Sequence, residues 1–237
     1  MMTKIKIKRL VTTICFLLGI TPLHGALVLE SYSFNNIGLA VPDGNASGAS
    51  DVRTISSGIG SISSVSVTIG ISSGFNGDLY LYLRHETGIS ILLNRTGRTS
   101  GNAYGYDDSG FNVTFQDGAA NGDVHRYRDV FTPAAGSALT GIWQPDARAV
   151  DPGSVTDASA RSAYLSSFNG MSASGSWTLF AADLQSGEVS TLNNWSMDLN
   201  GVSAVPEPVN VALAVFAVIL ILVTLLRRRS AAKMPAK

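Results

Sequence analysis

The chain has 237 residues, of which 45% are hydrophobic and 14% are charged, and its formal net charge is zero. The charges are segregated, because the segment from Ala26 to Ala204 holds eight arginines, no lysine and sixteen acidic residues, a balance of about −8. Such a segment lacks the basic surface that nucleic acids require, so we expect no nucleic-acid partner.

The N-terminus has the three-part layout of a secretory signal peptide. Four basic residues lie among the first nine, an apolar stretch runs from Leu10 to Ile20, and the small residues Gly25 and Ala26 follow. We predict residues 1–26 to be a signal peptide that is removed on export. Cys15, the sole cysteine, would leave with it, so the mature chain would have no disulfide.

Alternating apolar and polar side chains predict β-strands along most of the exported part. The clearest alternation covers residues 65–71, 79–83, 89–93, 111–115, 177–181 and 195–199. The polar break at 85–88 suits a hairpin. Residues 55–62 and 34–39 are expected to be further edge strands. The pattern predicts an all-β, antiparallel jelly-roll-like β-sandwich over residues 55–202, with 27–54 as an N-terminal extension or edge strand.

Two long polar segments, 95–110 and 134–160, are expected to be loops. Loop aspartates offer the hard oxygen ligands that calcium prefers. We therefore consider a calcium site among Asp78, Asp107, Asp108 and Asp183. The alternative, aspartates that only keep the surface solvated, stays open because no regular calcium-loop spacing is present.

Three short motifs occur along the predicted strands: Gly-Asp-Leu at 77–79, Gly-x-Trp-x-Leu at 175–179 with Asp183 four residues on, and Trp-Ser-Met at 195–197. Together they resemble a P/Homo B domain, the jelly-roll module that follows the catalytic domain in subtilisin-like proprotein convertases. The resemblance covers about residues 55–201. Gly77 and Asp78 form a turn pair, with Asp78 expected to bond backbone amides, and Trp177 and Trp195 are expected to meet in the core.

The resemblance does not bring catalytic machinery with it. A subtilisin domain needs roughly 250–300 residues that carry an Asp-His-Ser triad, and the chain has no room for one. His85 and His125 are expected to be exposed. A Gly-x-Ser-x-Gly pattern at 70–74 leads into another strand rather than the helix that a nucleophile elbow requires. We therefore expect no enzyme activity.

The C-terminal segment has three parts: Val205-Pro206-Glu207-Pro208, an apolar run at 209–226, and Arg227-Arg228-Arg229. In this order they resemble the PEP-CTERM sorting signal. Eighteen helical residues reach roughly 27 Å, just enough to cross a membrane, and the arginines would stay inside. We predict a linker at 203–208, a transmembrane helix at 209–226 and a basic cytoplasmic tail at 227–237. The resemblance implies processing by an exosortase-like membrane enzyme; an ordinary membrane anchor is the alternative.

Two functional hypotheses follow. In the first, the chain is an exported, exosortase-sorted bacterial envelope or exopolysaccharide-associated protein whose sandwich is a non-catalytic binding or structural module. It would be anchored in the inner membrane before processing and then reach the cell surface or extracellular matrix. In the second, the sandwich is an accessory P domain that works with a separate subtilisin-like serine protease.

Overall fold

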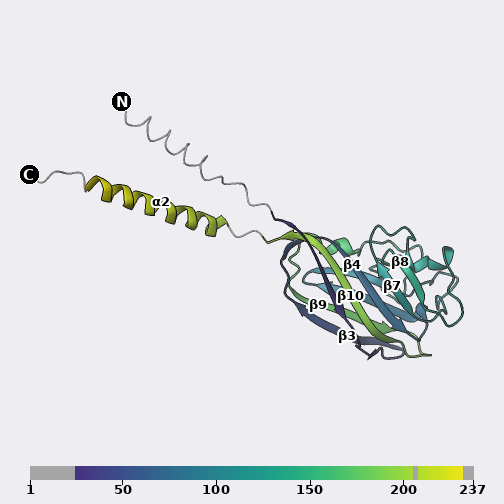
Figure 1. The fold of residues 1–237 in the computed structure, drawn as a ribbon. Helices are drawn as coiled ribbons and strands as arrows, with labels where there is room; N and C mark the ends of the chain where they lie inside the picture. Colours follow the sequence, from purple (N-terminus) through teal and green to yellow (C-terminus); the bar gives the residue numbers. More distant parts are fainter. Residues whose placement is uncertain (1–24, 205–207, 232–237) are drawn as a thin grey trace, which may run out of the picture. The chain divides into compact units, whose positions relative to one another are not determined.

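The computed structural model describes residues 25–204 and the helix 208–231. Residues 26–204 form one compact unit, a β-sandwich of two sheets (Figure 1). The helix, α2 (Pro208–Ala231), belongs to a second unit.

The first sheet has the strand order β1-β10-β4-β7-β8, with the short β2 also paired to β10. Its strands are β1 (Leu27–Phe34), β2 (Leu39–Ala40), β4 (Ile59–Ser72), β7 (Phe111–Phe115), β8 (Leu139–Trp143) and β10 (Thr191–Ser203). Every pairing is antiparallel except that of β7 with β8, which is parallel. The sheet is therefore mixed, where the sequence predicted antiparallel pairing throughout.

The second sheet is antiparallel, with the order β3-β9-β5-β6. Its strands are β3 (Asn45–Ile55), β5 (Leu79–His85), β6 (Gly88–Asn94) and β9 (Gly175–Asp183). Three short 3-10 helices lie in the connections: η1 (Asn76–Asp78), η2 (Val124–Asp129) and η3 (Leu165–Phe168).

The inward side chains of both sheets form one hydrophobic core. Val67 and Ile69 of β4 are buried against a cluster that includes Leu81 and Leu83 of β5 and Leu179 of β9. Each such side chain contributes about 1.5–3 kcal/mol when it is removed from water. The all-β sandwich prediction is confirmed, and all six strands with clear alternation lie within observed strands. The hairpin is also confirmed, since β5 and β6 pair across His85 and Gly88.

The predictions for residues 27–62 were partly wrong. Residues 27–54, expected to be an N-terminal extension or an edge strand, hold two long strands, β1 and β3, and each lies at the edge of its sheet. The strand expected at 34–39 is interrupted, because Asn36 and Gly38 adopt positive φ angles of 55° and 60°. The strand expected at 55–62 is divided: Ile55 ends β3, residues 56–58 form a turn, and residues 59–62 begin β4, which is an inner strand and not an edge strand.

Strand β8 lies in the segment that was expected to be a loop. Only Leu139 and Trp143 at its two ends are buried, and the three residues between them are exposed. Such a pattern carries no alternation, so only the pairing with β7 defines the strand.

Gly77, Trp177 and Trp195, which were singled out in the P-domain resemblance, have structural roles in the fold. An added Cβ on Gly77 would lie 2.3 Å from the Tyr104 carbonyl oxygen, so the backbones meet too closely for a larger residue. Trp177 stacks on His85, with ring centroids 4.2 Å apart. Trp195 instead packs against Phe34 and donates a 2.7 Å hydrogen bond to Asp51. The expected contact between the two tryptophans is absent from the aromatic pairs of the described residues.

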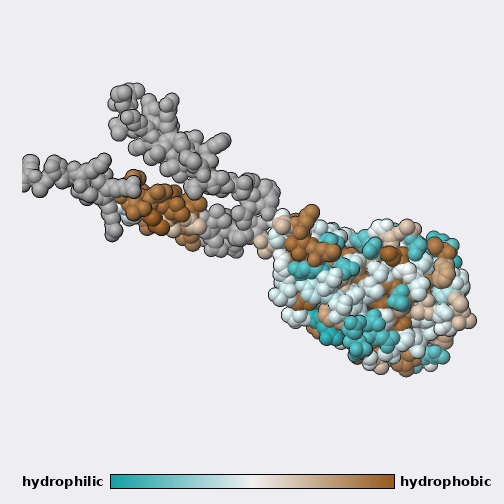
Figure 2. Space-filling view, in the orientation of Figure 1, coloured by the Kyte–Doolittle hydropathy of each residue, from teal (hydrophilic) through white to brown (hydrophobic). Residues whose placement is uncertain are grey.

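The C-terminal apolar run is helical, and Pro208 is the first residue of α2, where its missing N–H costs nothing. Its described side chains are largely exposed, among them Leu213, Phe216 and Leu220, and appear as the brown part of α2 in Figure 2. Within the described residues, no helix combines the length and apolarity needed to cross a membrane. The transmembrane prediction for 209–226 is therefore not confirmed; the run was marginal, with eighteen residues that include Asn210 and Thr224. The predicted signal peptide, except for Gly25 and Ala26, and Val205, Pro206 and Glu207 lie outside the described residues.

Candidate functional site

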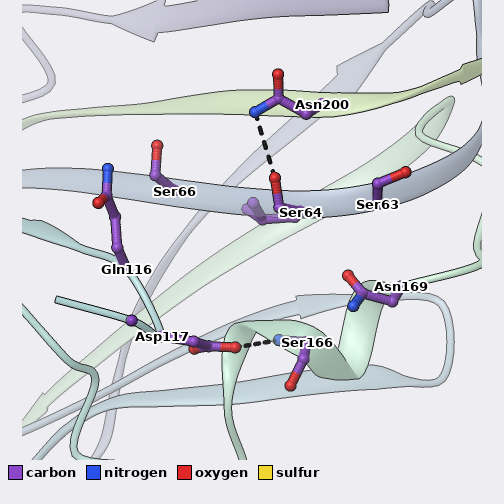
Figure 3. Close-up of a pocket in the computed structure, with 10 residues that line it drawn as sticks. Ser63, Ser64, Ser66, Gln116, Asp117, Ser166, Asn169 and Asn200 are labelled. Carbon is purple, nitrogen blue, oxygen red and sulfur yellow. Dashed lines mark hydrogen bonds between the residues drawn. The ribbon is translucent and has the colours of Figure 1, made fainter. Parts of the chain in front are cut away.

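A polar pocket of about 430 Å³ lies beside the first sheet, between β4, β10, the end of β7 and η3 (Figure 3). Hydroxyl and amide side chains line it: Ser63, Ser64, Ser66, Gln116, Ser166, Asn169 and Asn200. Its one carboxylate, Asp117, accepts hydrogen bonds from the Leu165 and Ser166 amides at 2.9 and 2.8 Å. Asp117 thus fixes the start of η3, and we call this hollow the serine pocket.

The outer face of the second sheet carries three aromatic side chains, Tyr80 and Tyr82 of β5 and Phe180 of β9, which we call the aromatic surface. Tyr82 pairs with Phe180 in the sheet register, and their rings stack with centroids 4.7 Å apart and planes 16° apart. Tyr80 meets Phe180 edge-on, at 6.4 Å. All three are only partly buried. Aromatic side chains normally lie in a core or at an interface, so their cluster on an outer face makes this surface a candidate for ligand binding.

A hollow of about 450 Å³ adjoins the aromatic surface. Besides the three rings it is lined by Arg95 and by the turn Asp151-Pro152-Gly153. Arg95 is held firmly, since its Nε donates to the Gly77 carbonyl at 2.7 Å and its Nη2 donates to Ala103 at 3.3 Å. Arg95 also has a positive φ of 53°, an uncommon conformation for a non-glycine residue.

The two hollows suit different ligands. The serine pocket offers neutral donors and acceptors but no aromatic ring, so it can bind a ligand only through hydrogen bonds that compete with water. The aromatic surface offers apolar area flanked by a guanidinium and a carboxylate. Apolar contact with a few placed polar groups is the usual composition of a binding site. The aromatic surface is therefore the stronger candidate.

The residues of the considered calcium site are not brought together as one group. Asp107 and Asp108 form ion pairs with Arg128, with oxygen–nitrogen distances of 2.5 and 2.8 Å. Asp78 and Asp183 lie at the ends of neighbouring strands, where Asp183 pairs with Leu79, the residue after Asp78, and Asp78 shares one hollow with Asp107. No cluster of three or more His, Cys, Asp or Glu side chains suited to a metal ion occurs in the described part of the chain.

Asp78 and Asp183 are buried carboxylates with few partners. Asp78 Oδ1 lies 3.7 Å from Arg95 Nη2, and burial, together with the charge of Asp183, raises the pKa of Asp78 to about 6. Asp183 Oδ1 accepts from the Gln185 amide at 3.2 Å, so this oxygen caps the loop that follows β9. Its Oδ2 has no hydrogen-bond partner among the described residues, and burial raises the pKa of Asp183 as well. The prediction that the Asp78 carboxylate bonds backbone amides was wrong, because its position faces Arg95.

The two histidines are fully buried, contrary to the prediction that they are exposed. His125 Nδ1 lies 2.7 Å from the Asp146 carboxylate, and this pair resembles the His and Asp of a catalytic triad. Its Nε2, however, lies 2.9 Å from the Arg98 carbonyl oxygen, so neither ring nitrogen is free to accept a proton from a nucleophile. His85 lies between the carbonyl oxygens of Ser172 and Ser176.

The serine of the Gly-x-Ser-x-Gly pattern, Ser72, is the last residue of β4, and the chain continues through η1 into β5. Its hydroxyl accepts a hydrogen bond from Asn193 at 3.0 Å. The motif therefore leads toward another strand, as its sequence predicted, and does not form the strand-to-helix elbow of a nucleophilic serine.

Sequence reasoning missed the aromatic surface because Tyr80 and Tyr82 were interpreted only as the polar half of an alternating strand. Their signal was present: both outward positions of that strand carry aromatic rings. Phe180 could not be paired with them without the register of β5 and β9.

No family model matches the chain, and no curated protein matches it significantly. Solved structures with similarity include the serine protease of Aeromonas sobria, with 16% identity and a TM-score of 0.43 over 79% of this chain and 29% of that one. The same protease in complex with its chaperone, ORF2, gives 16% identity and a TM-score of 0.42 over 81% and 29%. The chain thus spans less than a third of the matched chains, and the P-domain resemblance stays a prediction.

Proposed function

We propose that the chain is an exported, non-catalytic module of the bacterial envelope that binds a polysaccharide on its aromatic surface. The observation that carries the proposal is the cluster of Tyr80, Tyr82 and Phe180 on an outer sheet face, beside a hollow of about 450 Å³. A structural role alone would not require stacked rings on the outside of a sandwich.

The chemistry of a sugar ring fits this surface. A pyranose has one face of C–H bonds, which packs on an aromatic ring, and a rim of hydroxyl groups, which needs hydrogen-bond partners. Tyr82 and Phe180 supply a stacked apolar pair. Arg95 and Asp151, which line the hollow beside them, supply a donor and an acceptor for the hydroxyl rim.

Binding of the full-length chain to a panel of soluble oligosaccharides, including N-acetylglucosamine oligomers, tests the proposal by calorimetry. We expect Tyr82→Ala to weaken binding at least about tenfold, because it removes one ring of the stacked pair. Phe131→Ala is the matched control, since Phe131 is a half-exposed aromatic residue outside the hollow. A wild-type chain that binds no member of the panel, or equal losses in the two variants, would contradict the proposal.

We further propose that the C-terminus is the sorting address of this module. The support is the sequence, in which Val205-Pro206-Glu207-Pro208 precedes an apolar run and three arginines. Co-expression with an exosortase should give a shortened product, and changing Pro206-Glu207-Pro208 to alanines should abolish the shortening, as followed by size on a gel. Equal shortening of the wild-type chain and the alanine variant would contradict the sorting proposal, and it would leave the binding proposal unaffected.

A further inference from the structure

A second hollow, of about 260 Å³, lies beside the aromatic surface at the start of β5. Its walls include Phe75, Asp78, Tyr104, Tyr106, Asp107 and Gln185, and we call it the acidic hollow. Tyr104 is 67% exposed, so its ring is available to a ligand. Tyr106 is covered on one face by the Arg128 guanidinium, 4.7 Å from the ring centroid.

The acidic hollow and the aromatic surface share a wall. Asp78 lines the first, Arg95 lines the second, and the two side chains approach to 3.7 Å. The neighbouring residues Leu184 and Gln185 likewise line one hollow each. A chain-like ligand on the aromatic surface can therefore reach the acidic hollow with an adjacent unit.

Negative charge exceeds positive charge around the floor of the acidic hollow. Asp78 is 5% exposed and is influenced by the charges of Asp183 and Asp43, with Arg95 as the opposing charge. Arg95 donates its two hydrogen bonds to backbone carbonyls and lies 3.7 Å from Asp78, so it forms no hydrogen bond with that carboxylate. Asp183, which pairs with Leu79 on the neighbouring strand and is fully buried, keeps one carboxylate oxygen without a partner among the described residues.

Buried carboxylates with an incomplete set of partners favour a cation, and aromatic rings around them favour an organic one. Arg128, the other cation near the hollow, is already engaged by both Asp107 and Asp108. Since the described residues hold no three-ligand metal cluster, an alkylammonium group suits the hollow better than a metal ion.

We propose that the acidic hollow binds the ammonium group of an amino sugar, so that the ligand is a polysaccharide with free amines. This inference rests on the proposed function, because the sugar ring is held by the aromatic surface while Asp78 and Tyr104 contact the ammonium. The balance of about −8 on residues 26–204 would also attract such a cationic polymer over a distance.

The test compares glucosamine oligomers with N-acetylglucosamine oligomers of the same linkage and length, which differ only in the free amine. We expect the full-length wild-type chain to bind the glucosamine oligomer at least about tenfold more tightly in calorimetry. Equal affinity for the two would overturn the amino-sugar inference and leave the polysaccharide proposal intact. Binding of neither would overturn both.

Two variants locate the preference. Asp78→Asn, which keeps the shape of the side chain, should reduce the preference to less than about threefold while N-acetylglucosamine binding remains. Tyr104→Ala, at an exposed position that folding does not need, should weaken glucosamine binding about three- to fivefold. A preference that survives both changes would place the ammonium elsewhere and overturn the assignment.

An oligolysine competitor separates the saccharide from a basic peptide. We expect it to displace the glucosamine oligomer only weakly, because it presents no ring to the aromatic surface. Two results together would assign the hollow to lysine side chains instead. Oligolysine would displace the glucosamine oligomer at equal concentration, and it would compete equally well in the Tyr82→Ala variant.

Discussion

The outer faces of the two sheets differ although the inner faces follow the same rule. Facing outward, the first sheet has hydroxyl and amide side chains, such as Ser64 and Ser66 of β4 and Asn200 of β10. The second sheet has Tyr80, Tyr82 and Phe180 at the corresponding outward positions. The face of the sandwich visible in Figure 2 is mostly teal and white. Folding requires the inner face to be apolar and leaves the outer face freer to vary, so the difference between the two outer faces can be tested separately from stability.

The largest effect should come from the inner face of the aromatic sheet. Trp177 is fully buried and contacts His85 and Phe168. We expect Trp177→Ala to lower the free energy of unfolding by about 3–5 kcal/mol, because it leaves a cavity that the sheet cannot close. Urea denaturation measures the change.

Tyr82→Ala, on the outer face of the same sheet, is the matched comparison for Trp177→Ala. It should lower stability by less than about 1.5 kcal/mol, because its ring is only partly buried. Similar losses in the two variants would mean that the outer rings exist for stability, and the contrast between the two faces of the sheet would fail.

A smaller effect concerns pH. The pKa of Asp78 is about 6 in the folded chain and 3.8 ordinarily, so the folded state binds more protons between these values. The contribution of Asp78 to the free energy of unfolding should therefore be greatest below pH 3.8. It should fall by about 2–3 kcal/mol as the pH rises through 6. Asp78→Asn removes the buried negative charge that the carboxylate carries at neutral pH and should make the chain more stable than wild type there, as followed by thermal unfolding.

The control for Asp78→Asn lies on the polar sheet. Asp198 of β10 is exposed and accepts a 2.6 Å hydrogen bond from Ser31. Asp198→Asn should change the unfolding free energy by no more than about 0.5 kcal/mol. If Asp78→Asn instead destabilised the chain at neutral pH, the ion pair with Arg95 would outweigh the burial of the carboxylate.

The sequence predicted the parts of this fold in which alternation meets a buried face, such as β4 and β5, because the apolar period there is strict. It failed for β3, whose outer residues are polar and exposed along an edge, and for β8, which only its parallel partner defines. Of the site, the sequence pointed to Asp78 and Asp183 as acids worth attention. It could not show that Arg95 closes the wall between the two hollows, since that contact depends on the loops that bring Gly77 and Ala103 to its side chain.

The smallest effect is expected in the serine pocket, and it tests whether the polar sheet has a binding role. Asn200 donates a 3.3 Å hydrogen bond to the Ser64 hydroxyl on an exposed surface (Figure 3). Because water replaces such a bond readily, Ser64→Ala should change stability by less than about 0.5 kcal/mol. It should also leave oligosaccharide affinity within about twofold of wild type, since the pocket has no ring on which a sugar can stack. A tenfold loss of affinity in Ser64→Ala, with Tyr82→Ala unaffected, would move the binding surface to the first sheet and reverse the assignment of the two faces.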